Sequence, residues 1–252
     1  MRRALSVCAL LAIASAAPLV AQRGQRASGP PPAPRATAPF DLTGYWISVV
    51  TEDWRWRMIT PAKGDYASVP LNAAAERIVN AWDPARDEAA GEQCRPYGAP
   101  AVMRVPGRVH IAWDDDSTLR IETEAGTQTR LFHFASGGRD GGRSWQGESV
   151  ARWETAGRVG MFGAGPPPRA TGLKVVTTQL RPGYLRSNGV PYSANAVVTE
   201  YYNVLPKEEN GDVWLIITTV VQDPDYLTGR FITSTHFKKL PDGSAWRPTP
   251  CR

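Results

Sequence analysis

Apolar and polar residues alternate along three consecutive stretches between residues 108 and 134. Short turns rich in Asp and Gly separate them. The residues that share a face are Val109, Ile111 and Trp113 in the first stretch, Leu119, Ile121 and Thr123 in the second, and Arg130, Phe132 and Phe134 in the third, opposite Thr129, Leu131 and His133. A period of two with one wet face is typical of antiparallel strands. The stretches therefore predict a three-stranded meander.

Similar stretches of strand-like residues follow the meander. They cover residues 144–153, 173–180, 197–205, 213–221 and 231–239. The stretch 213–221 is almost entirely apolar or Thr, which predicts a strand covered on both faces. A sheet of this size must hide its edges. We therefore predict an all-β fold, an antiparallel and closed or nearly closed barrel of about eight strands, whose interior can hold side chains or one small ligand.

One helix is predicted before the meander. Apolar residues recur at intervals of three and four over residues 71–82, which is the pattern of an amphipathic helix. Asn72 is the expected N-cap, and Pro84 follows the last helical turn. The barrel is therefore expected to carry one short helix.

The N-terminal residues resemble a secretory signal peptide. Arg2 and Arg3 precede an apolar run, and small residues follow. A transmembrane anchor is the alternative, but the run is shorter than the roughly 20 residues that a span needs, and Pro18 interrupts it. We expect residues 1–21 to be a cleaved signal peptide, residues 22–39 to be a disordered Pro/Ala/Arg-rich spacer, and residues 40–252 to form a single β-barrel domain with no transmembrane segment in the mature chain.

The formal net charge of +5 belongs to the N-terminal end of the chain. Residues 1–36 contain five Arg and no Lys, Asp or Glu, so subtracting five from +5 leaves residues 37–252 neutral. Nucleic-acid binding normally requires a broad positive field. The charge balance therefore argues against a nucleic-acid partner.

Two cysteines remain after the expected signal peptide, Cys94 and Cys251. In an oxidising compartment two cysteines are expected to pair. The position of Cys251, next to the last residue, suits a structural disulfide better than a catalytic thiol. Disulfide and leader together predict a periplasmic or extracellular protein.

Several motifs resemble known families. Gly44-Tyr45-Trp46 is similar to the opening of lipocalin barrels, in which a Trp closes one end of the barrel. The segments CRPYG (94–98), WQGES (145–149) with RWE (152–154), and DPDYLT (223–228) resemble a family of secreted bacterial proteins of unknown function with a lipocalin-like β-barrel, over most of residues 41–251. The resemblance implies a barrel and export, and implies no activity. Many members of that family carry His at the position of Glu148.

Cofactor motifs are missing from the sequence. The three His residues lack the spacing of a metal site, and the run Asp114-Asp115-Asp116 lacks that of a calcium loop. Glycine pairs do not follow the strand–helix pattern of a phosphate loop, and there is no G-x-S-x-G motif. We therefore expect neither a metal nor a nucleotide cofactor.

Aromatic and charged residues form the remaining candidate site. Aromatic rings with a few polar groups are typical of small-molecule cavities, and a buried carboxylate can act as an acid or base. The predicted ligand-binding residues are Trp54, Trp56, Arg57, His133, Trp145, Glu148 and Tyr201, and the candidate catalytic residues are Glu148, Asp53 and His133.

Three functions stay open from the sequence. The first is the binding of a small apolar or aromatic molecule inside the barrel. The second is a hydrolase- or isomerase-type enzyme that uses a carboxylate in the same cavity. The third is an envelope component with a solid barrel. Neither the ligand nor the oligomeric state follows from the sequence.

Overall fold

The computed structural model describes residues 32–134, 142–155 and 170–252. The signal peptide expected at residues 1–21 and the spacer residues 22–31 lie outside the described residues. The elements are β1 (Gly44–Val49), α1 (Trp54–Arg57), α2 (Ala73–Ala81), α3 (Pro84–Ala89), the 3₁₀ turns η1 (Arg95–Tyr97) and η2 (Val102–Arg104), β2 (Arg108–Trp113), β3 (Thr118–Thr123), β4 (Thr129–His133), β5 (Glu148–Thr155), β6 (Ala170–Thr178), β7 (Gly183–Arg186), β8 (Val190–Tyr192), β9 (Val197–Val204), β10 (Trp214–Gln222) and β11 (Phe231–Lys239).

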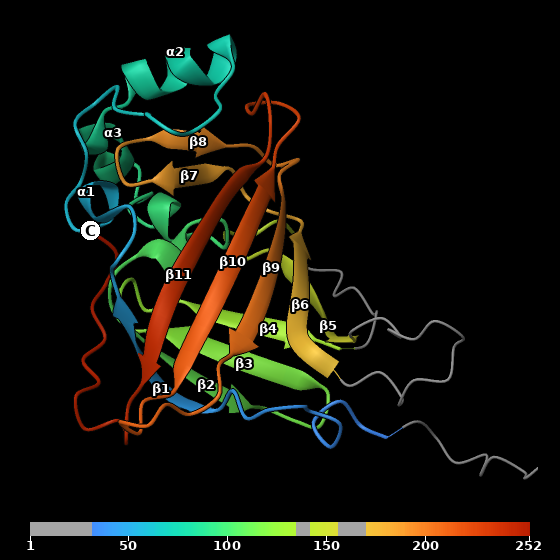
Figure 1. Ribbon diagram of the computed structural model, residues 1–252. Helices are drawn as coiled ribbons and strands as arrows, with labels where there is room; N and C mark the ends of the chain where they lie inside the picture. The colour runs from blue at the N-terminus through green and yellow to red at the C-terminus, as the bar shows by residue number, and fades with distance from the viewer. Residues whose placement is uncertain (1–31, 135–141, 156–169) are drawn as a thin grey trace, which may run out of the picture. The chain divides into compact units, whose positions relative to one another are not determined.

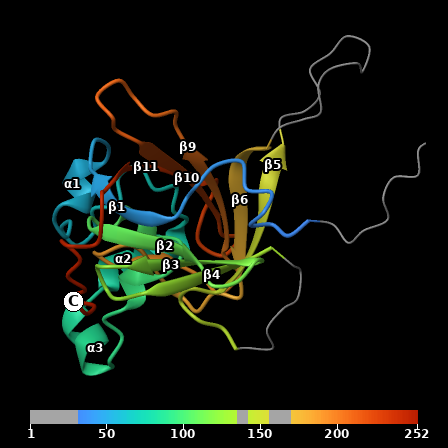
Figure 2. The ribbon, with the colours of Figure 1, turned by 90° about the horizontal axis from the view of Figure 1, so that it is seen from below.

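Nine of these strands form a closed barrel, which confirms the predicted fold class (Figure 1). Their order around the barrel is β1-β11-β10-β9-β6-β5-β4-β3-β2, and β7 and β8 form a separate hairpin. Viewed from below, β5 and β6 join the layer of β2, β3 and β4 to the layer of β9, β10 and β11 (Figure 2).

The strand count and one pairing differ from the prediction of about eight antiparallel strands. β4 and β5 pair in parallel, and only Phe132↔Ser149 and His133↔Val150 are in register there. A closed ring of nine strands cannot alternate direction throughout, because an odd number of strands leaves at least one pair running the same way. This short parallel pairing, the β4–β5 seam, is the consequence.

The alternation of apolar and polar residues along the strands places the barrel core largely as predicted from the sequence. The predicted apolar faces of β2 and β3 point inward, and on β4 the inward residues are Arg130 and Phe132. β10 differs from its prediction, because only Leu215, Ile217, Thr219 and Val221 are buried while the alternate residues are half-buried. Its outward β-branched side chains cover the barrel surface without a second layer above them.

The predicted helix is confirmed as α2. The side chain of Asn72 accepts hydrogen bonds from the backbone N–H groups of Ala74 and Ala75, both at 3.0 Å, as expected of an N-cap. Two further α-helices and two 3₁₀ turns also precede the meander, where one helix was expected. α1 has four residues and α3 six, which is too short for a helical period to show in the sequence.

Two insertions cover one end of the barrel and are called the cap here. The cap consists of residues 50–107, between β1 and β2, and residues 179–196, between β6 and β9 (Figure 1). Its core contains Ala75 and Val79 from α2, Val190 and Tyr192 from β8, and reaches Phe231 at the end of β11. Because the two insertions share this core, neither folds independently of the other.

The opposite end of the barrel is closed by aromatic rings. Trp46 is fully buried, and its indole N–H donates to the carbonyl of Leu42 at 2.9 Å. Trp153 packs edge-on against Phe40, and its indole N–H donates to the carbonyl of Pro34 at 2.9 Å. Pro34, which supplies this acceptor, belongs to residues 32–39, the end of the predicted spacer. This part of the chain therefore lies against the barrel.

The predicted disulfide between Cys94 and Cys251 is confirmed. It joins the cap to the C-terminal segment, residues 240–252, across 157 positions of sequence. The same segment is held at Thr249, whose backbone N–H donates to the carbonyl of Glu124 at 2.8 Å. Residues 240–252 are therefore fixed along the outside of the barrel and end at the cap.

Gly189, in the turn between β7 and β8, provides a test of cap packing. Its φ is +82°, and a Cβ there would lie 2.2 Å from the ring of Trp82. Gly91 also has a positive φ, +69°, but a Cβ there meets nothing within 4 Å. We expect Gly91→Ala to lower the free energy of unfolding by about 1 kcal/mol, the cost of a left-handed backbone, and Gly189→Ala to lower it by about 1–3 kcal/mol more, as overpacking does. Urea unfolding of both variants measures this, and equal losses would contradict the packing of Gly189 under Trp82.

Candidate functional site

Polar side chains fill part of the barrel interior. Arg130 of β4 forms a fully buried ion pair with Glu200 of β9, with nitrogen–oxygen distances of 2.9 and 2.5 Å. Tyr202 donates its hydroxyl to Glu200 at 3.1 Å, Thr177 accepts from Arg130 at 3.3 Å, and the hydroxyls of Thr177 and Ser149 are 2.8 Å apart. This interior network links β4, β5, β6 and β9, and occupies the space in which the sequence suggested a ligand.

The ion pair holds Arg130 in its charged form. Burial alone lowers the pKa of Arg130, but the charge and hydrogen bonds of Glu200 and Tyr202 outweigh burial and raise it. Burial and the charge of Glu200 raise the pKa of Tyr202 well above its usual value, so the phenol keeps the proton that it donates. The network is thus complete around Glu200, as expected of a structural rather than a reactive carboxylate.

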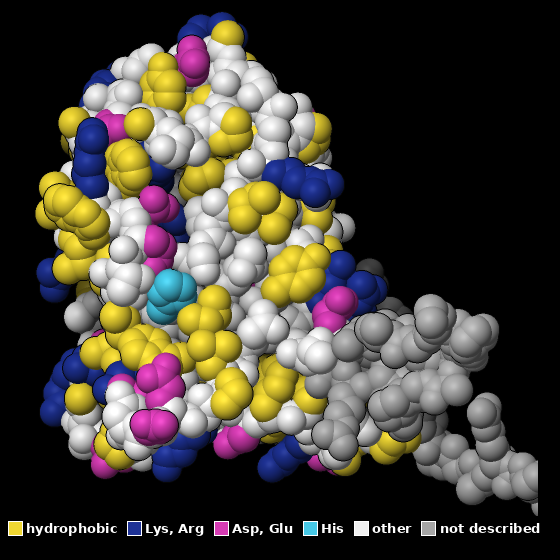
Figure 3. Space-filling view, viewed as in Figure 1, with side chains coloured by type: hydrophobic (Ala, Val, Ile, Leu, Met, Phe, Trp, Pro, Cys, Tyr) yellow, Lys and Arg dark blue, Asp and Glu magenta, His cyan; other side chains and the backbone are white. Residues whose placement is uncertain are grey.

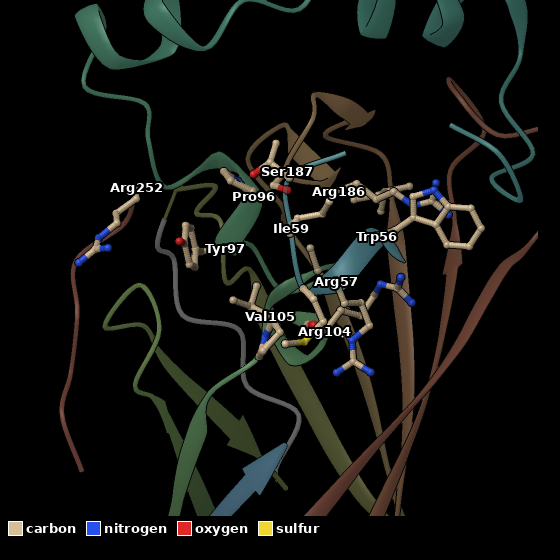
Figure 4. A pocket seen from close by; sticks show the side chains of 15 residues that line it. Trp56, Arg57, Ile59, Pro96, Tyr97, Arg104, Val105, Arg186, Ser187 and Arg252 are labelled. Carbon is tan, nitrogen blue, oxygen red and sulfur yellow. Dashed lines mark hydrogen bonds between the residues drawn. The ribbon is translucent and has the colours of Figure 1, made fainter. Parts of the chain in front are cut away.

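A cavity of about 250 Å³ lies in the cap, between α1, the two 3₁₀ turns and β7. Its lining side chains form two groups, seen in Figure 4 with Pro96, Tyr97 and Arg252 on one side and Trp56, Arg57, Arg104 and Arg186 on the other. Ile59, Val105 and Leu185 add apolar surface. This cap cavity therefore combines aromatic and aliphatic walls with a concentration of guanidinium groups.

Two of these arginines are paired with carboxylates of the segment before α1. Arg57 bonds to Glu52, and Arg104 to Asp53 at 2.9 Å. Both arginines are buried, at 7 % and 5 % exposed. Burial lowers the pKa of Arg57, and the neighbouring Arg104 lowers it further. The four residues form two pairs, each of a buried arginine with a partly exposed carboxylate, and the pairs carry no net charge.

Arg186 differs from both. It is 3 % exposed, and none of its three guanidinium nitrogens has a hydrogen-bond partner among the described residues. Its guanidinium lies over the ring of Trp56, 4.6 Å from the ring centre, a cation–π geometry. Burial, together with the charge of Arg104, lowers the pKa of Arg186 to about 10, so the group is charged at neutral pH.

An acidic cavity of about 370 Å³ adjoins the cap cavity. Asp87, Glu88 and Glu92 line it, and it shares Pro96, Ser187 and Arg252 with the cap cavity. Asp87 and Glu92 are both bonded to Arg95, at 2.6 and 3.2 Å. Asp87 therefore holds η1, which begins at Arg95, against α3, and Glu92 is engaged by the same arginine.

The structure does not bring the seven predicted ligand-binding residues into one cavity. Trp56 and Arg57 line the cap cavity. His133 and Glu148 line a third cavity of about 310 Å³, here called the seam cavity, beside the β4–β5 seam and facing away from the barrel interior. The two side chains have no hydrogen bond to each other in the described part of the chain.

The remaining predicted residues lie elsewhere. Trp54 is 67 % exposed on α1. Trp145 precedes β5 and packs under Arg181, 4.6 Å from its guanidinium. Tyr201 faces outward on β9, where Lys174 covers its ring at 5.4 Å. Asp53, a candidate catalytic residue, is paired with Arg104.

Two features of the sites were not predicted from the sequence. Arg104 and Arg186 lie in segments without a clear period, so nothing in the sequence marked their burial. Arg130 did carry a signal, because it shares a strand face with Phe132, and Glu200 shares one with Val198 and Tyr202. An inward cation and an inward anion on two strands of one small barrel point to an ion pair.

Comparisons of the chain with protein-family models, curated proteins and solved structures gave no match. Of the helices that the structure describes, none has the length and apolar character needed to cross a membrane. Within residues 32–134, 142–155 and 170–252, no three His, Cys, Asp or Glu side chains come together as metal ligands would. The function is therefore argued from the geometry of the sites described above.

Proposed function

We propose that this protein is exported to the periplasm or beyond and binds a small molecule with an apolar or aromatic body in the cap cavity. The observation that carries the proposal is the cavity itself, with Trp56, Tyr97, Ile59, Val105 and Leu185 on its walls. Apolar walls with a few placed polar groups are the usual form of a small-molecule site. Export is supported by the Cys94–Cys251 disulfide and by the expected leader.

The rim of the cavity also favours an apolar ligand. Met58 and Ile59, which follow α1, line the cavity and are 59 % and 67 % exposed, and Trp54 is exposed on α1 itself. In the space-filling view, hydrophobic side chains gather along the edge of the molecule over α1 (Figure 3). An exposed apolar patch beside a cavity is typical of a ligand-binding entrance.

Binding is favoured over the alternative, an enzyme that uses Glu148, Asp53 or His133. Asp53 is paired with Arg104 at 2.9 Å, so its carboxylate is already engaged by a side chain of the protein. A catalytic acid–base pair requires hydrogen-bond reach between its members or to the substrate, and none joins Glu148 to His133 among the described residues. The barrel is accordingly a scaffold that carries the cap.

Val105→Phe tests the position of the site. Val105 lines the cap cavity, so a phenyl ring there would fill part of the space for a ligand. Binding of 2-naphthoate and 2-naphthamide, measured by isothermal titration calorimetry, should weaken by at least about tenfold for each compound that binds the wild type. The matched control is Ile232→Phe, which adds a similar ring at a residue of β11 that is 58 % exposed. Binding that Val105→Phe leaves unchanged would place the site outside the cap.

A further inference from the structure

The charges around the cap cavity do not balance. Arg57 is paired with Glu52 and Arg104 with Asp53. On α1, Arg55 is paired with Asp65 at 2.8 Å. Arg186 alone among these four arginines has no carboxylate partner in the described chain, so this group of residues carries one positive charge in excess.

An unpaired buried guanidinium is unfavourable. Burying an ionised group without a partner is strongly unfavourable, because the group loses its hydration and gains nothing in return. Among the described residues, Arg186 keeps the cation–π contact with Trp56, 4.6 Å from the ring centre. Its donors at Nε, Nη1 and Nη2 remain without acceptors among the described residues. These donors match the two oxygens of a carboxylate, which a guanidinium binds bidentately.

We propose that the ligand of the cap cavity is a monoanion, a carboxylate on an apolar or aromatic body, and that Arg186 binds the carboxylate. The proposal rests on the proposed function and specifies its ligand class. The carboxylate pairs with Arg186 beside Trp56, and the body lies along Ile59, Val105 and Tyr97. One negative charge balances the buried arginines of the cavity, because Arg57 and Arg104 already have partners and Arg252, which also lines the cavity, is exposed.

The planar guanidinium of Arg186 also gives selectivity. Its N–H groups are fixed in one plane, and its carbon lies 4.6 Å from the ring centre of Trp56. An amide of the same shape as the carboxylate presents one acceptor oxygen and two donors, and its donors would face the N–H groups of Arg186. The site is therefore expected to discriminate strongly against neutral isosteres.

The test compares 2-naphthoate with 2-naphthamide, which differ in charge and not in shape. By isothermal titration calorimetry at pH 7, the wild type should bind 2-naphthoate roughly 10–100-fold more tightly than 2-naphthamide, the effect of one charged hydrogen-bonded pair. Arg186→Met should remove this preference by weakening 2-naphthoate to the level of the amide. Arg186→Lys, which keeps the charge and loses the planar fork, should restore part of it.

Arg152→Met is the matched control. Arg152 lies on the outer face of β5, does not line the cap cavity and has a side chain that is 66 % exposed, so its loss should leave the preference unchanged. Circular dichroism establishes that each variant is folded. Should Arg186→Met fail to fold, Arg186→Lys decides the matter, because a lysine without the planar fork should still reduce the preference for 2-naphthoate.

Each outcome separates the two proposals. Equal binding of both compounds by the wild type overturns the carboxylate assignment and leaves the cap cavity as a site for aromatic molecules. Tighter binding of 2-naphthyl phosphate than of 2-naphthoate overturns the single-charge assignment. If neither compound binds, or if Val105→Phe has no effect on binding, the proposed function itself fails and the role of Arg186 with it.

Discussion

Replacing Glu200 by Gln lowers the free energy of unfolding by about 3–5 kcal/mol, because removing one partner leaves the other charge buried and unpaired. Arg130 and Glu200 are both fully buried and joined by two hydrogen bonds. The amide offers one acceptor oxygen where the carboxylate offered two. Urea unfolding followed by tryptophan fluorescence measures the loss.

Glu154→Gln is the matched control for this loss. Glu154 pairs with Arg152 at 3.0 Å on the outer face of β5, where the side chains are 34 % and 66 % exposed. Exposed pairs contribute about 0–1 kcal/mol. A loss in Glu200→Gln no larger than in Glu154→Gln would show that the buried pair does not stabilise the barrel.

The double variant Arg130→Met/Glu200→Leu separates pairing from burial. Replacing both members of a buried pair with apolar side chains is often neutral or stabilising, so the double variant should be more stable than Glu200→Gln. If the loss of stability in the double variant equals the sum of the losses in the two single variants, Arg130 and Glu200 are not coupled. Because the pair connects β4 to β9 across the β4–β5 seam, we also expect its loss to speed hydrogen exchange in β4 and β5 first.

Replacing both Cys94 and Cys251 by Ser lowers the free energy of unfolding by about 2–5 kcal/mol. The disulfide closes a loop across 157 positions of sequence. A disulfide that closes a long loop removes more conformational entropy from the unfolded chain than one that closes a short loop. Guanidinium unfolding of the oxidised wild type and the double variant gives the difference.

Reduction of the wild type provides the control. Dithiothreitol should lower the stability of the wild type to that of the Ser variant and leave the variant unchanged. A reduced wild type as stable as the oxidised protein would contradict a stabilising role. Since Arg252 adjoins Cys251 and lines the cap cavity, loss of the bond should also weaken binding there.

Local patterns were sufficient for much of the fold. Alternation in β2 and β3 gave the inward residues correctly, since a strand residue faces core or solvent by position alone. Asn72 marked the start of α2 through a cap that acts within three residues. α3 escaped prediction, because none of its residues is buried and no apolar stripe marks it.

The candidate site was predicted less completely. Trp56 and Arg57 were singled out, and both line the cap cavity. Arg104 and Arg186 come from segments 47 and 129 positions after Arg57, and only the packing of the two cap insertions brings them together. A contact between residues so far apart in the sequence leaves no periodic pattern or motif in any one segment.

The sequence by itself determined the all-β class, the faces that β2 and β3 turn inward and the two cysteines that pair. These follow from interactions within a strand, or from there being only two cysteines after the expected leader. Only the tertiary structure decided the parallel β4–β5 seam, the pairing of Arg130 with Glu200 and the cavity in the cap. Closure of nine strands into a ring fixes the seam and brings distant side chains face to face, and neither depends on any single stretch of the chain.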